Sequence, residues 1–363
     1  MRICILLAKT IDPSTSTEAL DGTTPRPEYL VLQEALGADI LSFGDVEASD
    51  HPSVVRARRR SLWWGLATLA FHHRKDYEHF YCTGEDIAFP FAALMLGVAD
   101  LGRITTVVHN VGTPKWRALM RAVPSLVWRN IICLGESQRR IVVERNRTPG
   151  EIVHTFPLWV DTKFFDPAKV AARTASPYVF ACGRERRDYP MLAEAASGSE
   201  LPFRVVASGT DPRSGFRAAD GALPAPNVVV ESRVLTFHEL RDAYAGARVV
   251  AVPIQEVSYG AGVSNIVESM CMARPVVVTS SPGIVDYVEP GVSGLLSPVG
   301  EPIAFRSALE TLFADPARAS EMGHRNRTYA VDHFGVERYA ARVAGLFGMV
   351  PVTGPMHEGP TSD

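Results

Sequence analysis

The chain has 363 residues, 46% of them apolar and 21% charged, a balance typical of globular proteins long enough for two domains. Its formal net charge of −3 argues against a general affinity for nucleic acid. No apolar run is long enough to span a bilayer, and the short run after Met1 predicts a β-strand instead of a signal peptide. The five cysteines are scattered singly with no Cys-x-x-Cys pair, which predicts reduced thiols and a cytoplasmic protein.

Strand-like and helix-like runs alternate through the first half of the chain, which predicts βαβ units and a parallel sheet. The predicted strands are Ile3–Leu7, Asp39–Phe43, His79–Cys82, Ile104–His109, Ile131–Leu134 and Ile152–Thr155. The predicted helices are Pro27–Leu36, Val54–His72, Phe89–Leu101, Trp116–Val127 and Ser137–Arg145.

Within this half, the basic run Arg56–Arg60 (RARRR) precedes the apolar segment SLWWGLATLAF. One interpretation is a helix that lies on a membrane surface. The other is a helix of the first domain with solvated arginines, and we favour it because Trp63, Leu66 and Ala70 fit one buried stripe. A peripheral membrane contact stays open as the second choice.

A second alternation of strands and helices begins near Tyr178. Its predicted strands are Tyr178–Cys182, Phe203–Ser208, Val228–Glu231, Val249–Val252, Val276–Thr279 and Gly294–Ser297. Its predicted helices are Pro190–Ala196, Thr236–Ala245, Ser264–Ala273, Ile284–Val288, Ile303–Phe313 and Val336–Phe347. We therefore expect domains at 1–165 and 166–333, a C-terminal helix at 334–349, and a disordered tail at 350–363.

The segment Ser258–Gly283 is the most informative in the chain, because a glycine-bearing loop leads into a short helix and then a strand. We expect Ser264 to cap this helix, and Glu268 lies one turn further on the same side. Free N–H groups and the dipole at a helix N-terminus suit a phosphate, and a carboxylate one turn further suits sugar hydroxyls. An ordinary crossover with Glu268 in water fits the pattern equally well.

Several common motifs are absent from the sequence. No Gly-x-Gly-x-x-Gly follows the first strand, and no Gly-x4-Gly-Lys-Ser/Thr segment occurs, which argues against a dinucleotide-binding fingerprint and a P-loop. No Asp-x-Asp and no His/Cys cluster with zinc spacing occurs, so no metal site is predicted.

The segment VSNIVESMCMARPVVVTSSPGIVDYVEPGVSGLLSP resembles the donor-binding segment of GT-B glycosyltransferases, in particular the large retaining family four. WVDTKFFDP is similar to the family's linker between domains, and FACGRERRDYPMLAEA to its phosphate-facing strand and loop. ESRVLTFHELRDAYAGARVVAVP resembles its base-binding region, and ICLGESQRRIVVE its final N-domain helix. These segments follow one another in the family's order over residues 104–330.

This resemblance implies an α/β GT-B fold, in which two Rossmann-like domains face each other across a cleft and the C-terminal helix returns to the N-terminal domain. It implies that the first domain binds an acceptor, either a small molecule or a glycoconjugate. The second domain would bind a nucleotide diphosphate sugar, most simply a UDP- or GDP-sugar. Transfer to a hydroxyl or amine would proceed with retention and without a cofactor or metal.

Carried over by position, the resemblance implies that Arg184 and Arg187 bind the diphosphate and that Glu268 binds ribose. It also implies that His109, at a strand end, contacts the donor sugar. An ion pair of Arg187 with Asp188 or Glu185 and strand capping for His109 are the structural alternatives. The further donor-binding candidates are Gly260, Ala261, Gly262, Val263, Ser264, Asn265, Arg233, Val234 and Leu235. The acceptor-side candidates are Thr10, Glu85, Asp86 and Lys115.

One position departs from the family pattern. The first glutamate of the family's Glu-x7-Glu motif, which usually contacts the donor sugar, falls at Gly260, and Glu256 lies four residues too early. Two other functions therefore stay open beside glycosyl transfer. These are a sugar-nucleotide epimerase of the same architecture and a sugar-nucleotide-binding protein without catalysis.

Overall fold

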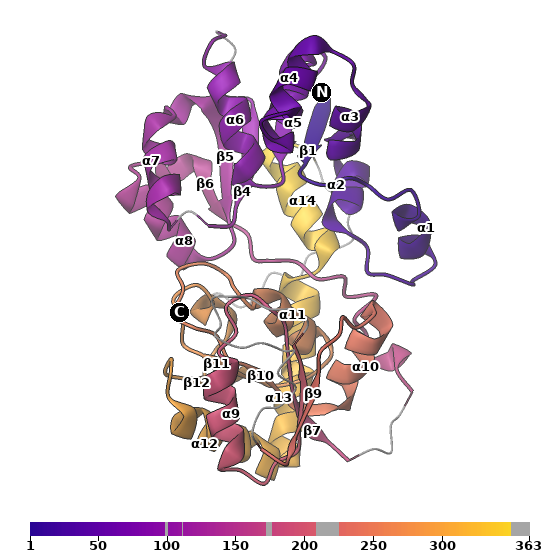
Figure 1. Cartoon of the computed structure of the whole chain (residues 1–363), viewed down its shortest axis with the longest axis vertical. Helices are drawn as coiled ribbons and strands as arrows, with labels where there is room; N and C mark the ends of the chain where they lie inside the picture. The colour runs from indigo at the N-terminus through magenta and orange to yellow at the C-terminus, as the bar shows by residue number, and fades with distance from the viewer. Residues whose placement is uncertain (99–100, 111, 172–175, 208–224, 350–363) are drawn as a thin grey trace.

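The computed structural model describes residues 1–98, 101–110, 112–171, 176–207 and 225–349. They form two α/β domains, drawn one above the other in Figure 1, each built on one parallel six-stranded sheet. The tail predicted at 350–363 lies outside the described residues.

The first sheet has the strand order β2-β1-β3-β4-β5-β6. Its strands are β1 (Ile3–Leu7), β2 (Asp39–Ser42), β3 (His79–Cys82), β4 (Ile104–Val108), β5 (Trp128–Cys133) and β6 (Val153–Thr155). Its helices are α1 (Thr15–Leu20), α2 (Glu28–Leu36), α3 (Phe43–Ala48), α4 (Pro52–Arg58), α5 (Leu62–His72), α6 (Glu85–Met95), α7 (Pro114–Ala122) and α8 (Glu136–Arg140), which continues as a π-helical turn over Ile141–Arg145.

The second sheet has the order β12-β11-β10-β7-β8-β9. Its strands are β7 (Tyr178–Cys182), β8 (Phe203–Val206), β9 (Val228–Glu231), β10 (Ala247–Val252), β11 (Val276–Thr279) and β12 (Gly294–Ser297). Its helices are α9 (Tyr189–Ser197), α10 (Phe237–Gly246), α11 (Val263–Cys271), α12 (Pro302–Ala314) and α13 (Pro316–His333), and α14 (Val336–Leu346) ends the described chain.

The predicted strands are all present, but several helix predictions were wrong. The single helix expected at Val54–His72 is divided into α4 and α5, because the Ser61 hydroxyl accepts the Trp64 N–H and starts a new helix. The segment Ile284–Val288 holds only a 3-10 turn. Helices α1, α3 and α13 were not predicted. In α13 there are too few apolar residues to show the helical spacing of three to four residues.

Both faces of the first sheet are covered by helices, which explains its continuous apolar strands. Alternate side chains of β1 enter different clusters: Cys4 and Leu6 pack toward α5 and α6, whereas Ile3 and Ile5 pack toward α2 and α14.

The C-terminal helix α14 returns to the first domain, as predicted (Figure 1). It packs beside α2, and its Tyr339 hydroxyl lies 2.6 Å from the Tyr81 hydroxyl of β3 in a buried hydrogen bond. Val343 and Ala344 bury their side chains in the same cluster as Leu32.

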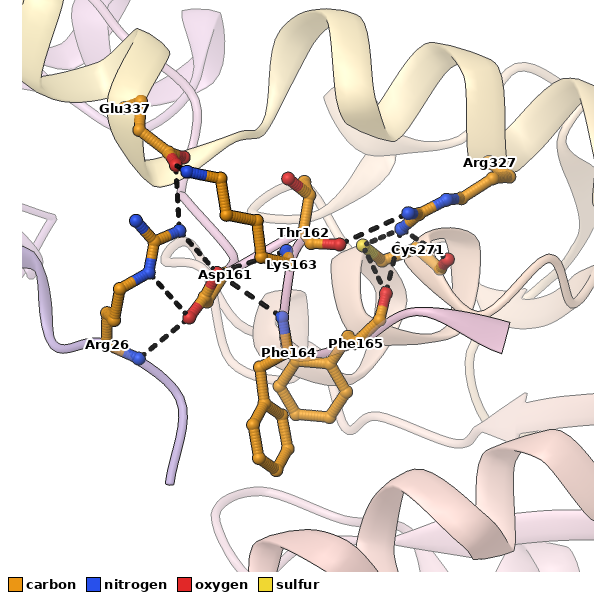
Figure 2. A network of polar contacts seen from close by, with 9 residues as sticks. All are labelled: Arg26, Asp161, Thr162, Lys163, Phe164, Phe165, Cys271, Arg327 and Glu337. Atoms are coloured by element: carbon orange, nitrogen blue, oxygen red, sulfur yellow. Dashed lines mark hydrogen bonds and ion pairs between the residues drawn. The ribbon is translucent and has the colours of Figure 1, made fainter. Parts of the chain in front are cut away.

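The segment that crosses from the first domain to the second is held by charge (Figure 2). Arg26, just before α2, donates its backbone N–H and its Nε–H to Asp161 Oδ2 over 2.8 and 3.0 Å. A guanidinium nitrogen of Arg26 also donates to Asp161 Oδ1 at 2.6 Å and to Glu337 at 2.8 Å. Lys163 pairs with the same Glu337 carboxylate at 2.8 Å. One cluster therefore joins the first domain, the crossing segment and α14.

A second arginine fixes the crossing segment to the other domain (Figure 2). Arg327 of α13 donates to the backbone oxygens of Thr162 and Phe165, and also to the Cys271 carbonyl at the end of α11. The crossing segment is thus bonded to both domains within five residues, which limits how they can move apart.

Burial of Asp161 would raise the pKa of its carboxyl, but the hydrogen bonds from Arg26 outweigh burial and hold that pKa below its ordinary value of 3.8. A lowered folded-state pKa stabilises the fold above the unfolded-state pKa, and the stabilisation is lost as the pH falls through the folded-state value. The ion pair therefore contributes fully at neutral pH.

We expect Asp161→Asn to lower the free energy of unfolding by about 3 kcal/mol at neutral pH, because a buried ion pair loses one partner. Asp332→Asn is the matched control, since Asp332 is about half exposed (49%) in its pair with Arg338, and it should cost less than about 1 kcal/mol. Urea unfolding measures both. The Asp161 difference should shrink below pH 3.8, and equal losses for the two variants at neutral pH would contradict this assignment.

Candidate functional site between the two domains

The connectivity of each sheet marks where a ligand would bind. In the first sheet the strand order reverses between β1 and β3, and in the second between β7 and β10. Ligands of parallel sheets bind beyond the carboxyl ends of the strands at such reversals. The loops after β7 and β10 are also bonded to each other, since the Gln255 N–H donates to Arg186 O and the Asp188 N–H to Pro253 O.

A cavity of about 370 Å³ lies between the domains at these loops. Its lining from the first domain is His109, Asn110, Leu134, Gln138 and Leu158, and from the second domain Glu185, Tyr259, Gly260, Val263, Ser264, Gly283 and Tyr287. Two larger cavities, of about 490 and 580 Å³, lie at the amino ends of the two sheets, away from the predicted site residues. The interdomain cavity is the one that joins His109 to the start of α11.

The start of α11 presents backbone donors to this cavity. Its N-cap is Gly262 with φ +88°, so the prediction that Ser264 caps the helix was wrong. A Cβ at Gly262 would lie 2.8 Å from Ile254 Cδ1, so the left-handed turn and the close packing both require glycine. The Val263 N–H donates to Gly260 O at 3.3 Å, and because Gly262 has no side chain to cap the helix, the N–H groups of Ser264 and Asn265 keep their capacity to bind an anion.

Two hydroxyls, one at the end of β11 and one in the loop that follows it, brace the loop before α11. Thr279 Oγ1 accepts the Ile254 N–H at 2.8 Å and donates to the Ile254 carbonyl at 2.7 Å. Ser281 Oγ does the same for Val257, at 2.9 and 2.8 Å. The loop is therefore fixed by side chains that satisfy its buried backbone groups.

Arg187 is buried, with 4% of its surface exposed, and does not line the cavity. Its guanidinium donates to the carbonyls of Cys182 and Glu185 at 2.9 and 2.8 Å, and to Asn265 Oδ1. The ion pair with Asp188 or Glu185 considered from the sequence is not formed by these bonds, because the acceptor at Glu185 is its carbonyl. Arg184, three residues earlier, is exposed.

Glu268 lies behind the first turn of α11 and accepts a hydrogen bond from the Tyr244 hydroxyl at 2.8 Å. Asn265 Nδ2 donates to that same hydroxyl at 2.9 Å. Burial raises the pKa of Glu268 to about 7, against smaller lowering effects of the Tyr244 hydrogen bond and the charge of Arg187. Glu268 is therefore not a solvated surface carboxylate.

His109 follows β4 and is held at three points. Its backbone N–H donates to Glu85 at 2.8 Å, its carbonyl accepts from Gln138 Nε2 at 2.9 Å, and its ring Nε2 lies 3.1 Å from Thr83 O. A carbonyl only accepts, so this last contact puts a proton on Nε2 and leaves Nδ1 of the neutral ring as an acceptor.

Glu85 is not turned toward an acceptor. It is 4% exposed, and its second oxygen accepts the Asn110 N–H at 2.8 Å. Its carboxylate is thus used to shape the loop after β4. Of the other acceptor-side candidates, Asp86, Thr10 and Lys115 are exposed, and Lys115 Nζ lies 4.5 Å from the Trp116 ring centroid.

Burial raises the pKa of Asp86, with a further rise from the neighbouring Glu85 charge and opposing effects from Lys115 and His109. Asp86 does not line the interdomain cavity.

The candidates Arg233, Val234 and Leu235 follow β9, at the outer edge of the second sheet. Arg233 pairs with Glu231 and Glu239 at 3.0 and 2.9 Å. They too lie outside the lining of the interdomain cavity.

Several residues that build the site were not found from the sequence. Tyr259 donates its hydroxyl to the Glu185 carboxylate at 2.7 Å, and both residues line the interdomain cavity. Tyr287 donates its hydroxyl to Leu134 O and accepts the Leu158 N–H at 2.9 Å, so it bonds the two domains together. Their only sequence signal is a place in the long segments that follow β10 and β11, which many residues share.

The family model described as "Glycosyl transferases group 1" matches residues 179–315, from β7 to just past α12. Over 137 residues the chain is 34% identical to a D-inositol 3-phosphate glycosyltransferase of Kineococcus radiotolerans, covering 34% of this chain and 31% of that one. Over 215 residues it is 26% identical to a protein of the same name from Xylanimonas cellulosilytica, covering 54% and 51%. The chain thus spans about a third and about half of the lengths of these relatives.

Among solved structures, Anabaena HepE in complex with UDP-glucose superposes with a TM-score of 0.67. The match covers 95% of this chain and 99% of that one at 13% identity, and it shows a shared GT-B fold. Within the described ranges, no helix is long and apolar enough to cross a bilayer. No group of three or more His, Cys, Asp or Glu side chains in that part of the chain is placed to hold a metal ion.

We expect Glu268→Gln to change the pH dependence of stability. With a folded-state pKa near 7 and an ordinary value of 4.5, the native state keeps a proton that the unfolded state has lost, so the free energy of unfolding falls as the pH rises between these values. The variant lacks this titration and should gain stability relative to the parent from pH 5 to pH 8 in urea unfolding. Glu337→Gln is the control, because the Glu337 pKa is lowered below its ordinary value of 4.5 and its stability difference should therefore be constant from pH 5 to pH 8. A pH-independent difference for Glu268→Gln would contradict the assignment.

We expect Glu85→Ala to cost about 1–3 kcal/mol of unfolding free energy, because the N–H groups of His109 and Asn110 lose a buried acceptor. Asp86→Asn is the control, since it changes an exposed carboxylate one residue away and should shift stability by less than about 0.5 kcal/mol. Chemical denaturation of both variants measures the two losses of unfolding free energy. A near-neutral Glu85→Ala would show that the loop after β4 does not need this carboxylate.

Proposed function

The chain belongs to the group 1 glycosyltransferases of GT-B fold, and from that membership we propose that it transfers a glycosyl group from a nucleotide diphosphate sugar to an acceptor hydroxyl or amine. The second domain would bind the donor and the first domain the acceptor. We take the anomeric configuration to be retained, in keeping with the family.

One observation carries this proposal. The uncapped start of α11 and His109 line the same interdomain cavity, although they come from different domains. An anion at the helix start and a hydroxylated ring at His109 fit the two halves of a diphosphate sugar.

In the proposed reaction the bond between the anomeric carbon and the phosphate oxygen breaks, and its electron pair stays on the phosphate. The acceptor oxygen bonds to the anomeric carbon on the same face, and its proton passes to the departing phosphate oxygen. Charge grows on that phosphate, so the first-turn amides of α11 and the exposed guanidinium of Arg184 stabilise the transition state more than the ground state.

Arg187 and Glu268 have supporting and binding roles in this scheme. Arg187 donates to protein oxygens, so it acts on the diphosphate through its charge and through its hold on Asn265. Glu268, at pKa about 7, would accept hydrogen bonds from the ribose hydroxyls in its ionised form.

Gly260 replaces the usual first glutamate, and the packing around it is close. A Cβ there would lie 3.2 Å from Val263 Cγ2, so a larger side chain would press on the first turn of α11. We propose that the donor sugar is held instead by backbone groups of this loop and by His109. We propose a UDP- or GDP-sugar as the donor. The complex of HepE with UDP-glucose supports a UDP-sugar.

All five cysteines are free and buried, which supports our proposal of a reducing, cytoplasmic setting. A thermal-shift screen against UDP-, GDP-, ADP- and dTDP-sugars tests the donor, because a bound donor raises Tm by mass action. Release of nucleotide diphosphate over an acceptor panel then tests transfer. Conversion of UDP-GlcNAc without any acceptor would favour an epimerase, and donor binding without turnover a binding protein.

We expect Arg184→Ala to lower kcat by about 10²-fold with a smaller change in donor Kd, because its charge matters most as the phosphate departs. Arg318→Ala, an exposed arginine of α13, is the matched control and should leave both constants unchanged. Arg187→Ala should lower kcat and Tm together, since this side chain is buried and bonded. An unchanged kcat in Arg184→Ala would remove Arg184 from the mechanism.

A further inference from the structure

Five exposed residues of the first domain form a surface that the fold leaves without a partner. We call it the Arg–Trp surface: Arg56, Arg59, Arg60, Trp63 and Trp64. Trp63 and Trp64 expose 43% and 39% of their area at the first turn of α5. The expected buried stripe is therefore only partly correct, because Leu66 and Ala70 are buried and Trp63 is not.

The packing of α5 keeps the two tryptophans outside. Its buried face is Gly65, Leu66, Ala67, Leu69 and Ala70. A Cβ at Gly65 would lie 2.6 Å from Val46 Cγ1 and 3.0 Å from Arg58 Cβ, so the helix is pressed against its neighbours there. Rotating α5 to bury Trp64 would break this contact, so exposure of the tryptophans is built into the fold.

Of the four arginines in this run, one forms hydrogen bonds within the first domain and three are exposed. Arg58 donates to the carbonyls of Val46, Glu47 and Ser49 and so closes the end of α3. Arg56, Arg59 and Arg60 are exposed and form no ion pair with any carboxylate in the described ranges. Cationic and aromatic groups are thus presented together without a compensating anion.

The chemistry of this surface favours one kind of partner. Tryptophan rings settle at the boundary between lipid tails and headgroups, and arginines beside them bind anionic headgroups. A symmetric contact with a second copy would bring the arginines of both copies together, which like-charge repulsion opposes. An anionic lipid surface satisfies the charge and the aromatic rings at the same time.

The Arg–Trp surface also adjoins the loop after β1. The Trp63 ring packs edge-on against Phe43 with centroids 6.1 Å apart, and the Phe43 N–H donates to Lys9 O at 3.1 Å. Lys9 and Thr10 follow β1 where the strand order of the first sheet reverses. We propose that the Arg–Trp surface docks the protein on anionic lipid headgroups, with the loop after β1 turned toward the bilayer. This inference does not depend on the transfer reaction.

Cosedimentation of the full chain with vesicles tests it directly. We expect binding to vesicles of equal parts phosphatidylglycerol and phosphatidylcholine, no binding to pure phosphatidylcholine, and weakening from about 0.1 M to about 0.5 M salt. Tryptophan emission should shift to the blue on binding, because the indoles leave water.

The double variant R59E/R60E should weaken binding by about 30-fold or more, the factor expected for two lost headgroup contacts. R318E/R325E makes the same change in net charge on α13 of the other domain and should keep near-parental binding. Trp64→Gln should reduce both binding and the blue shift, and it serves as the second variant if the double variant is unfolded by circular dichroism.

Three results would overturn the proposal: no binding of the parent to anionic vesicles, equal losses in the two double variants, or binding unchanged in Trp64→Gln. Lipid-independent dimerisation that Trp64→Gln abolishes would assign the surface to a second copy instead, and would also overturn it.

Discussion

The buried ion pair between Arg26 and Asp161 fixes the crossing segment to the first domain, and the Tyr287 hydrogen bonds join the two domains directly. Asp161 lies in the crossing segment with 2% of its side chain exposed, so its charge is tolerable only while Arg26 stays beside it. Because Glu337 of α14 shares the same guanidinium, moving the crossing segment away would leave the Asp161 carboxylate buried without its cation. The interdomain cavity lies between the two domains that this cluster and the Tyr287 hydrogen bonds hold together.

The second constraint is the way the donor loop is built. An anion site at a helix start requires amides that the protein leaves unsatisfied, which is costly unless the surrounding loop is rigid. Gly262 supplies the turn without a capping side chain, and Thr279 and Ser281 fix the loop before it. The second sheet thus maintains the conformation of the loop that leads into α11.

The fold was largely predictable from sequence because strands buried on both faces, such as β1, give unbroken apolar runs. The failures have physical causes: α13 is too polar to show a period, and the Ser61 cap that divides α4 from α5 lies inside a continuous basic and apolar run. For the site, the loop and helix of residues 260–268 could be predicted, since local pattern carries them. The orientations of Arg187 and Glu85 could not, because Arg187 donates to the Asn265 side chain in α11 and Glu85 accepts the backbone N–H groups of His109 and Asn110 after β4, and these partners are distant in sequence.

The residues around Glu268 show why position alone does not define a role. Arg187 donates to Asn265 Oδ1, Asn265 Nδ2 donates to the Tyr244 hydroxyl, and that hydroxyl donates to Glu268. Every donor points from the cation toward the carboxylate, so the charges at the two ends determine the orientation of the Asn265 amide and each bond polarises the next. An aspartate at position 265 would accept from Arg187 but could not donate to Tyr244. The chain of hydrogen bonds therefore links the charge of Arg187 to the Glu268 carboxylate through the side chains of Asn265 and Tyr244.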